Sequence, residues 1–168
     1  SKEGAFVLKT KNLVRAAMLV ALGVALSNFI YFPVGASKCT PVQHIINVIA
    51  GITLGPSYAV VIAFLISAIR NIIGTGTLLA FPGSMIGAFL AGLLYKKTKN
   101  KIFAAAGEIV GTGIIGAIVA YPIAKFIIGK EATVLFFVLP FLINTVVGSI
   151  IALFILKGAK IVTDKYKK

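Results

Sequence analysis

The stretch Ser67–Ser84, SAIRNIIGTGTLLAFPGS, decides the fold because it interrupts long apolar sequence with a charge and a backbone break. The charge is Arg70, and the break is the Phe-Pro-Gly at 81–83, which follows a Gly-Thr-Gly at 74–76. A charge inside hydrocarbon usually faces protein, water or a ligand. Non-helical backbone at membrane depth needs protein or a cavity to satisfy its polar groups. The stretch predicts a helix–turn–helix at one membrane face that lines a small-molecule site. The alternative is an ordinary loop whose arginine snorkels to the interface.

The composition places the chain in a membrane. Of its 168 residues 59% are hydrophobic and only 12% are charged, whereas soluble domains average about 25% charged residues. The length suits six spans of roughly 20 residues. We therefore predict an all-α integral membrane protein with six transmembrane helices in one domain, residues 1–168, and expect no ATPase or other catalytic module within it.

The net charge of +13 is distributed in a way that argues against nucleic-acid binding. Most of the cations form three clusters beside apolar segments, which is the pattern of cytoplasmic flanks. These clusters contain Lys2, Lys9, Lys11 and Arg15; Lys96, Lys97, Lys99 and Lys101; and Lys157, Lys160, Lys165, Lys167 and Lys168. A single cysteine and a single histidine leave no internal disulfide and no Cys/His metal site.

The apolar segments predict helices at 13–32, 42–54, 57–73, 78–95, 102–128 and 134–156, with both termini cytoplasmic. The remaining cations, Lys38, Arg70, Lys125 and Lys130, then lie outside, and 33–41 is a polar outer loop. We expect a kink at Pro122. A stripe of small residues, Gly83, Gly87 and Ala91, should pack closely on a neighbouring helix.

Two further features concern the first and fifth segments. Ala17, Ala21 and Ala25 share one helix face and would let a partner helix approach closely, although alanine is also simply common in membrane helices. Glu108 lies within apolar sequence, where an acid is usually paired. We expect it to pair with Arg15; a proton-carrying role is the alternative.

Polar residues embedded in apolar sequence gather in the outer half of their segments and predict one pocket open to the outside. Its walls would include aromatic rings, side-chain amides and the Arg70 cation. The candidate ligand-binding residues are Gln43, His44, Asn47, Arg70, Asn71, Thr75, Thr77, Phe81, Ser84, Tyr121 and Asn144. For His44 the alternative is an interfacial histidine bonded to backbone. No nucleophile–base pair, metal-ligand set or nucleotide-binding loop is recognisable, so we expect no enzyme, no metal and no cofactor.

The runs at 41–99 and 107–125 carry a resemblance to a known family. The most specific part is RNIIGTGTLLAFPGS at 70–84. The chain resembles the substrate-binding (S) components of energy-coupling factor vitamin transporters, and specifically their thiazole, thiamine-precursor (ThiW-like) type. The resemblance extends over nearly the whole chain.

That resemblance implies a high-affinity subunit in the plasma membrane of a prokaryote. It would capture a thiamine precursor from outside, close the loop at 33–41, and topple in the membrane on a transmembrane coupling protein driven by two cytoplasmic ATPases. Ala17 and Ala21 match the family's docking face, and Tyr121 and Asn144 match its ligand contacts. Related thiamine-binding members place an acid near 80–82, where this chain has Ala-Phe-Pro. The difference favours neutral hydroxyethylthiazole over thiamine.

Three alternatives remain open at this point. The chain could be an S component for another vitamin. It could be a small homodimeric, proton-coupled secondary transporter in which Glu108 carries the proton. It could also be a structural membrane subunit without a ligand, in which case the 70–84 stretch is only a loop.

Overall fold

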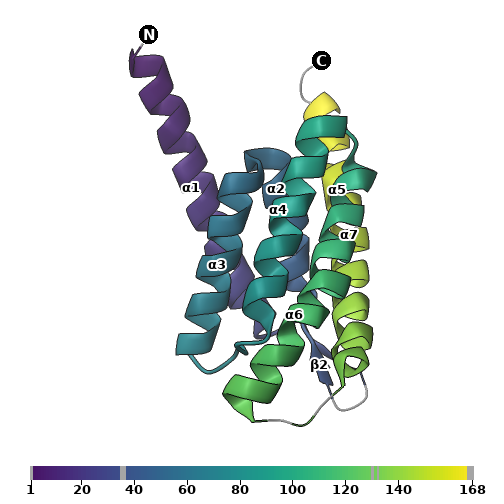
Figure 1. Cartoon of the computed structure of the whole chain (residues 1–168). Coiled ribbons are helices and arrows are strands. Elements are labelled where there is room, and N and C mark those ends of the chain that lie inside the picture. The colour runs from purple at the N-terminus through teal and green to yellow at the C-terminus, as the bar shows by residue number, and fades with distance from the viewer. Residues whose placement is uncertain (1, 35–36, 130, 132, 166–168) are drawn as a thin grey trace.

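The computed structural model describes residues 2–34, 37–129, 131 and 133–165. This part of the chain is almost entirely helical, with one two-stranded hairpin after the first helix (Figure 1). The elements are α1 (Lys2–Ser27), β1 (Phe32–Val34), β2 (Ser37–Cys39), α2 (Val42–Leu54), α3 (Pro56–Ile72), α4 (Ala80–Thr98), α5 (Lys101–Glu108), η1 (Ile109–Gly116), α6 (Ala117–Pro122), η2 (Ile123–Ile128) and α7 (Val134–Lys165). The four elements from α5 to η2 follow one another without a break, so 101–128 is one long helix with two π-helical stretches.

The helices form an elongated bundle with both chain ends at the same end of it (Figure 1). The α3–α4 turn and the hairpin lie at the opposite end, and the first half of α1 diverges from its neighbours. Within the described residues three helices are long and apolar enough to cross a membrane, Lys9–Ser27, Lys101–Ile128 and Leu135–Asp164. Two shorter helices, Val42–Leu54 and Pro56–Ile72, are also apolar. The all-helical class is confirmed, whereas six spans and cytoplasmic termini stay predictions.

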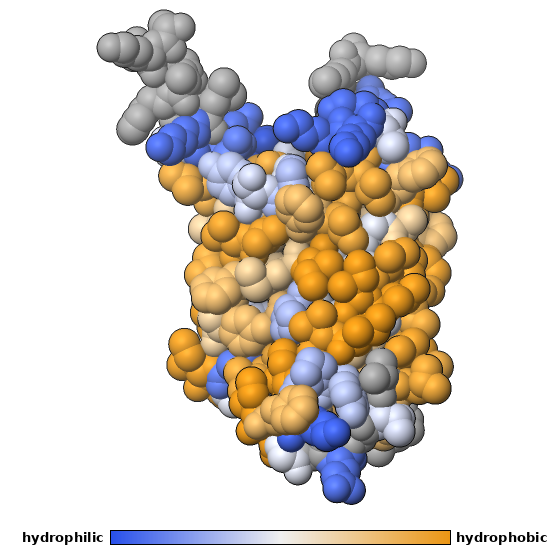
Figure 2. All heavy atoms as spheres, viewed as in Figure 1, coloured by the Kyte–Doolittle hydropathy of each residue, from blue (hydrophilic) through white to orange (hydrophobic). Residues whose placement is uncertain are grey.

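The surface agrees with a lipid environment. Figure 2 shows a broad apolar band across the middle of the face in view, with hydrophilic residues at the end that carries the termini and others at the opposite end. Large apolar side chains are exposed on several helices, for example Phe89, Ile118 and Phe154, which is 71% exposed. Apolar patches of this extent are rare on soluble monomers. The helices therefore expose the side chains that a bilayer core would cover.

Small residues bring α4 against the long fifth helix. A Cβ on Gly83 would lie 3.1 Å from the Cα of Gly116, and one on Gly111 would press on the backbone of Gly87 at 2.6 Å. Ala91 is fully buried one turn further along. The predicted small-residue stripe is thus confirmed as a close helix–helix contact. This contact matters for the site because it brings the fifth helix within reach of α2 and α4.

Local signals set the turns at the end of the bundle that carries the termini. Gly55 adopts φ 88° and Pro56 follows as the first residue of α3, a position where proline's missing N–H is harmless. Between α4 and α5, Lys99 is left-handed with φ 56°, and the Asn100 side chain accepts a hydrogen bond from the Ile102 N–H at 2.9 Å. Both turns are therefore short, and they align consecutive helices side by side.

Several predicted boundaries are corrected. The predicted helix 13–32 begins and ends too late, because the observed helix covers Lys2–Ser27. The predicted helix 134–156 ends too early, because α7 continues to Lys165. The loop predicted at 33–41 contains an antiparallel hairpin that pairs Phe32 with Cys39. Residues 35–36 of that loop lie outside the described residues, as do Lys130 and the side chain of Lys38. The backbone changes from α to π directly after Pro122, where a kink was expected.

Candidate functional site

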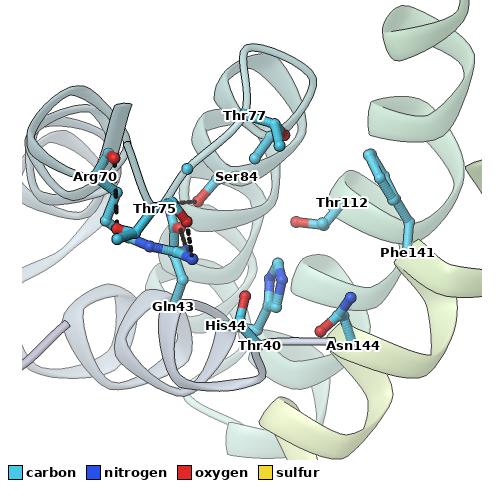
Figure 3. A pocket seen from close by; sticks show the side chains of 12 residues that line it. Thr40, Gln43, His44, Arg70, Thr75, Thr77, Ser84, Thr112, Phe141 and Asn144 are labelled. Carbon is cyan, nitrogen blue, oxygen red and sulfur yellow. Dashed lines mark hydrogen bonds between the residues drawn. The ribbon is translucent and has the colours of Figure 1, made fainter. Parts of the chain in front are cut away.

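A polar cavity of about 220 Å³ lies in the half of the bundle remote from the termini. Its wall comes from the end of the hairpin, α2, the α3–α4 turn, α4, η1 and α7. The lining residues are Thr40, Gln43, His44, Arg70, Thr75, Gly76, Thr77, Ala80, Ser84, Thr112, Phe141 and Asn144. Figure 3 shows their side chains facing one space, with Arg70 and Gln43 on one side and Phe141 and Asn144 on the other.

Arg70 is held in the cavity wall by the turn that follows it. Its guanidinium donates to the Thr75 carbonyl at 3.0 Å and to Gln43 Oε1 at 3.1 Å. The turn is possible because Gly74 takes φ 76°, a left-handed conformation that costs glycine little. The N–H groups of Thr75 and Gly76 then return to the Arg70 carbonyl at 2.8 and 2.9 Å. Arg70 is only 7% exposed, so it is a fixed wall group and does not snorkel to the surface.

Gln43 connects this arginine to the neighbouring helices. While its oxygen accepts from Arg70, its amide donates to Ser67 Oγ at 2.7 Å and to Ser84 Oγ at 2.9 Å. Gln43 is 3% exposed, and both serines are equally well buried. Hydrogen bonds therefore fix the rotamer of Gln43, and with it one side of the cavity, between α2, α3 and α4.

A buried carboxylate lies directly behind the opposite part of the wall. Glu108 is completely buried, and its Oε1 lies 2.8 Å from His44 Nδ1. The same oxygen accepts from Asn47 Nδ2 at 3.1 Å and from Thr112 Oγ1 at 2.9 Å. The expected partner Arg15 is instead exposed on α1. The reason for this difference is that α2 is short. Its first turn lies at the same depth in the bundle as Glu108, so the His44 side chain contacts the carboxyl group.

Most of the predicted ligand-binding residues do meet at this cavity. Those that line it are Gln43, His44, Arg70, Thr75, Thr77, Ser84 and Asn144. Asn47 and Asn71 lie behind the wall. Asn47 is fully buried and bonded to Ser84 and Glu108, while the Asn71 amide donates to the carbonyls of Ser67 and Thr77. These two residues brace the site and do not face it.

The aromatic wall differs from the prediction. Phe81 lies outside the polar cavity, in an edge-on contact with Phe64 at 5.8 Å and along a separate apolar groove with Ile123. Tyr121 lies next to Lys125, whose Nζ is 3.5 Å from the tyrosine hydroxyl. The ring that lines the cavity belongs to Phe141. The corrections follow from helix rotation, which turns Phe81 and Tyr121 away from the space between α2, α4 and α7.

Sequence reasoning also passed over Thr40, Ala80 and Thr112. Thr112 had a usable signal, because it is a hydroxyl one turn from Glu108 within apolar sequence. Its Oγ1 lies 3.0 Å from the Gly83 carbonyl as well as near Glu108. Thr40 and Ala80 carry no such signal, since only the tertiary arrangement brings them to the cavity.

A second hollow lies between α1 and α3 and differs entirely in character. This apolar groove of about 590 Å³ is lined by alanines of α1 and large side chains of α3. The lining residues are Leu13, Ala16, Ala17, Val20, Ala21, Val24, Ala25, Tyr58, Val61, Ile62, Leu65 and Ile69. The predicted docking residues Ala17, Ala21 and Ala25 are thus together and exposed on one surface.

Residues 13–161 match the family model described as thiamine-precursor transporter protein, ThiW. This match covers most of the 168-residue chain. The chain belongs to the ThiW family. No curated protein and no solved structure gives a match. Membership in ThiW confirms the thiamine-precursor type of the resemblance and identifies a transporter rather than an enzyme, in agreement with the long apolar helices.

The lining of this cavity is mainly made of residues with hydrogen-bonding side chains. It offers one cation, hydroxyls, an imidazole, a side-chain amide and a ring face within a small volume. Several buried polar atoms around it have no hydrogen-bond partner in the described part of the chain, among them Arg70 Nε and Asn144 Oδ1. No group of three metal-ligating side chains is found among those same residues. The hydrogen-bonding groups of the lining could bind a small polar ligand.

Proposed function

We propose that this ThiW member is the substrate-binding subunit of an energy-coupling factor transporter and that it imports hydroxyethylthiazole. The observation that carries the proposal is the Arg70-containing cavity in a chain whose residues 13–161 match a thiamine-precursor transporter family. The family supports a thiamine precursor as the class of substrate. The cavity supports hydroxyethylthiazole as the substrate within that class.

The size and lining of the cavity favour a single small ring. At about 220 Å³ it is smaller than the roughly 300–1,000 Å³ pockets that hold drug-sized ligands. A thiazole ring would stack on Phe141, and its hydroxyethyl oxygen would accept a hydrogen bond from Arg70. Asn144 also lines the cavity, and its amide nitrogen donates to the Pro140 carbonyl at 3.1 Å. Thiamine, which adds a second ring, is a poor match for this volume.

The proposed orientation follows from charge. Positively charged residues concentrate on the cytoplasmic side of membrane proteins. Lys96, Lys97 and Lys99 follow one another at the end of the bundle that carries the termini. That end is then cytoplasmic and the cavity opens toward the outside, in a six-helix topology in the plasma membrane of a prokaryote. Residues 1–168 act as one substrate-binding domain.

The groove between α1 and α3 is the proposed contact with the coupling protein. Its exposed alanines would allow an incoming helix to approach the backbone of α1 closely. The coupling protein would bring two cytoplasmic ATPases, and ATP hydrolysis by these partners would drive release of the ligand inside. The groove lacks hydrogen-bonding side chains other than Tyr58, which suits a helix partner better than a polar ligand.

One observation supports a second candidate. The buried Glu108–His44 pair, 2.8 Å apart, is the type of group that carries protons in secondary transporters. A homodimeric, proton-coupled transporter would take up its ligand in proteoliposomes that contain no ATPase. Uptake of this kind that is lost in Glu108→Gln would favour this candidate over the first.

The first test is a binding screen on the purified chain in detergent, read by thermal shift and native mass spectrometry. The panel is hydroxyethylthiazole, its phosphate, thiamine, the aminopyrimidine precursor and an unrelated vitamin. We expect the thiazole alcohol to bind and to raise the unfolding temperature, and Arg70→Ala to weaken that binding with the fold intact. Binding of a different vitamin by a folded sample, or unchanged affinity in Arg70→Ala, would contradict the proposal.

A further inference from the structure

Two opposite charges are buried on either side of the cavity. Arg70 of α3 is 7% exposed and Glu108 of α5 is 0% exposed. Arg70 lines the cavity itself. Glu108 does not, but the two lining residues in front of it, His44 and Thr112, are both bonded to its Oε1. The cavity therefore has a cation in one wall and an anion immediately behind the opposite wall.

A continuous set of hydrogen bonds joins the two charges. Arg70 donates to Gln43, and Gln43 donates to Ser84. Asn47 donates to the same Ser84 hydroxyl at 3.0 Å and to Glu108 at 3.1 Å. These neutral side chains all belong to α2 and α4 and have less than 4% of their surface exposed. The charges thus form one polarised network around the cavity, and they are not two independent surface groups.

Among the described residues, Arg70 and Glu108 have no charged partner other than His44, which lies beside Glu108. Across the described chain the only ion pair with Glu108 is to His44, and the other Arg70 contacts are to a carbonyl and a side-chain amide. In the charge state that the proposal requires, with Glu108 ionised and the imidazole neutral, Arg70 and Glu108 contribute one positive and one negative charge, so the site as a whole is balanced. Buried charges interact strongly because protein and lipid screen them weakly. An ionic ligand would upset this balance, whereas a neutral dipolar ligand would fit between the two charges.

A glycine provides the space in which the Glu108 carboxyl group lies. A Cβ at Gly87 would overlap Glu108 Oε2 and Thr112 Oγ1. Glycine at this position therefore leaves the volume in which the carboxylate lies. Its Oε2 has no partner among the residues that the structure describes, while Oε1 takes all three hydrogen bonds. The acid is held in one fixed orientation toward the cavity wall.

We propose that Arg70 and Glu108 together set the charge selectivity of the cavity, so that a neutral azole alcohol binds while ions of the same size are rejected. This inference rests on the proposed function and adds the determinant of its selectivity. Arg70 contacts the ligand. Glu108 is a positioning residue that acts through His44 and Thr112 and through its charge.

The test uses three probes of matched size at neutral pH. They are hydroxyethylthiazole, the anion in which its CH₂OH is replaced by a carboxylate, and the cation in which its ring nitrogen is methylated. Dissociation constants are measured by titration calorimetry for the wild type, Arg70→Gln, Glu108→Gln and the double variant. Arg15→Gln and Glu131→Gln are matched controls, because both residues are exposed and neither lines the cavity.

The wild type should prefer the alcohol over both ions. Glu108→Gln leaves a site with a net positive charge. It should raise the affinity for the anion relative to the affinity for the alcohol by about tenfold, corresponding to about 1.4 kcal/mol. Arg70→Gln should raise the affinity for the cation relative to the affinity for the alcohol by a similar factor. The double variant should prefer the alcohol again, and the two controls should behave as wild type.

The opposite direction of the two shifts separates charge selectivity from simple damage. A variant that only disturbs packing would weaken the binding of all three probes by the same factor. That result in both single variants overturns the inference. Equal wild-type affinity for alcohol and carboxylate overturns it as well. If the alcohol binds but selectivity does not reverse, the proposed function survives alone. If the wild type binds none of the azoles, both proposals fail.

Discussion

The polar cavity and the α1–α3 groove are both hollows of one helical bundle, but their chemistry is opposite. In the cavity most of the polar wall side chains are hydrogen-bonded in advance, as Arg70 and Gln43 illustrate. In the groove the wall is formed mainly by alanines, Ala21 among them, and branched apolar side chains. A preorganised polar wall recognises one small molecule, whereas a smooth apolar wall admits another helix. The two surfaces therefore suit two different partners, and variants should affect them separately.

The largest expected effect concerns the groove. Ala21→Leu should reduce uptake in cells to the level seen without the protein, because the longer side chain would keep a partner helix away from α1. The Kd for hydroxyethylthiazole should change by less than about twofold, since distant sites behave independently. Transport assays and calorimetry on the same variant check both statements.

Ala106→Leu is the matched control for that experiment, because Ala106 is also exposed on a helix but does not line the groove. It should transport normally. Full uptake by Ala21→Leu would show that the groove is not the docking surface. A loss of ligand binding in Ala21→Leu would show that the two hollows are not separate.

The next effect is on the cavity. Gly87→Ala should lower the free energy of unfolding by about 1–3 kcal/mol, because the added methyl group overlaps Glu108 and Thr112. The displacement of the carboxylate should weaken ligand binding by about tenfold or more. Denaturation and binding titrations measure the two effects.

Gly158→Ala provides the control, since Gly158 is exposed in α7 with nothing near its Cβ position. Alanine is the better helix former, so this variant should be at least as stable as wild type. Wild-type affinity in a folded Gly87→Ala sample would mean that the position of Glu108 has no influence on the cavity.

A smaller effect is expected for Asn144→Ala. Loss of a single neutral hydrogen bond corresponds to about 1 kcal/mol, or roughly a fivefold increase in Kd. The exposed Asn28 serves as a control, and Asn28→Ala should bind as wild type. If Asn144→Ala binds as tightly as wild type, the ligand does not use this side of the cavity.

The smallest effect distinguishes two phenylalanines. Phe141→Leu should weaken binding of the azole by a few-fold, because ring contacts contribute about 0.5–1.5 kcal/mol beyond the buried area. Phe81→Leu should leave the Kd unchanged, since this ring packs on Phe64 outside the cavity. The reverse order in calorimetry would restore the sequence-based assignment of the aromatic wall.

The contrast also explains which features were predictable. The bounds of α2 and the start of α3 were accessible because Gly55 and Pro56 punctuate the sequence locally. The hairpin after α1 was not, because its strands are three residues long and lack alternation. The polar side of the cavity was accessible for a related reason: a residue such as Arg70 is conspicuous within apolar sequence.

What sequence could not provide is the rotation of each helix. Phe81 and Phe141 are indistinguishable by residue type, and only tertiary packing turns Phe141 into the cavity and Phe81 away from it. Similarly, the partner of Glu108 depends on how deep α2 begins in the bundle, which brings His44 rather than Arg15 to the carboxylate. Apolar wall residues and long-range pairs therefore needed the structure, and so did the sorting of polar residues into those that line the cavity and those, such as Asn47, that lie behind its wall.

The most direct test of the central claim is a structure determined with hydroxyethylthiazole bound, with the anomalous signal of its sulfur used to place the ring. The account predicts the ring against Phe141 and the hydroxyl within hydrogen-bond distance of Arg70, and an empty α1–α3 groove. A ligand located in the groove, or bound without contact to Arg70, would contradict it.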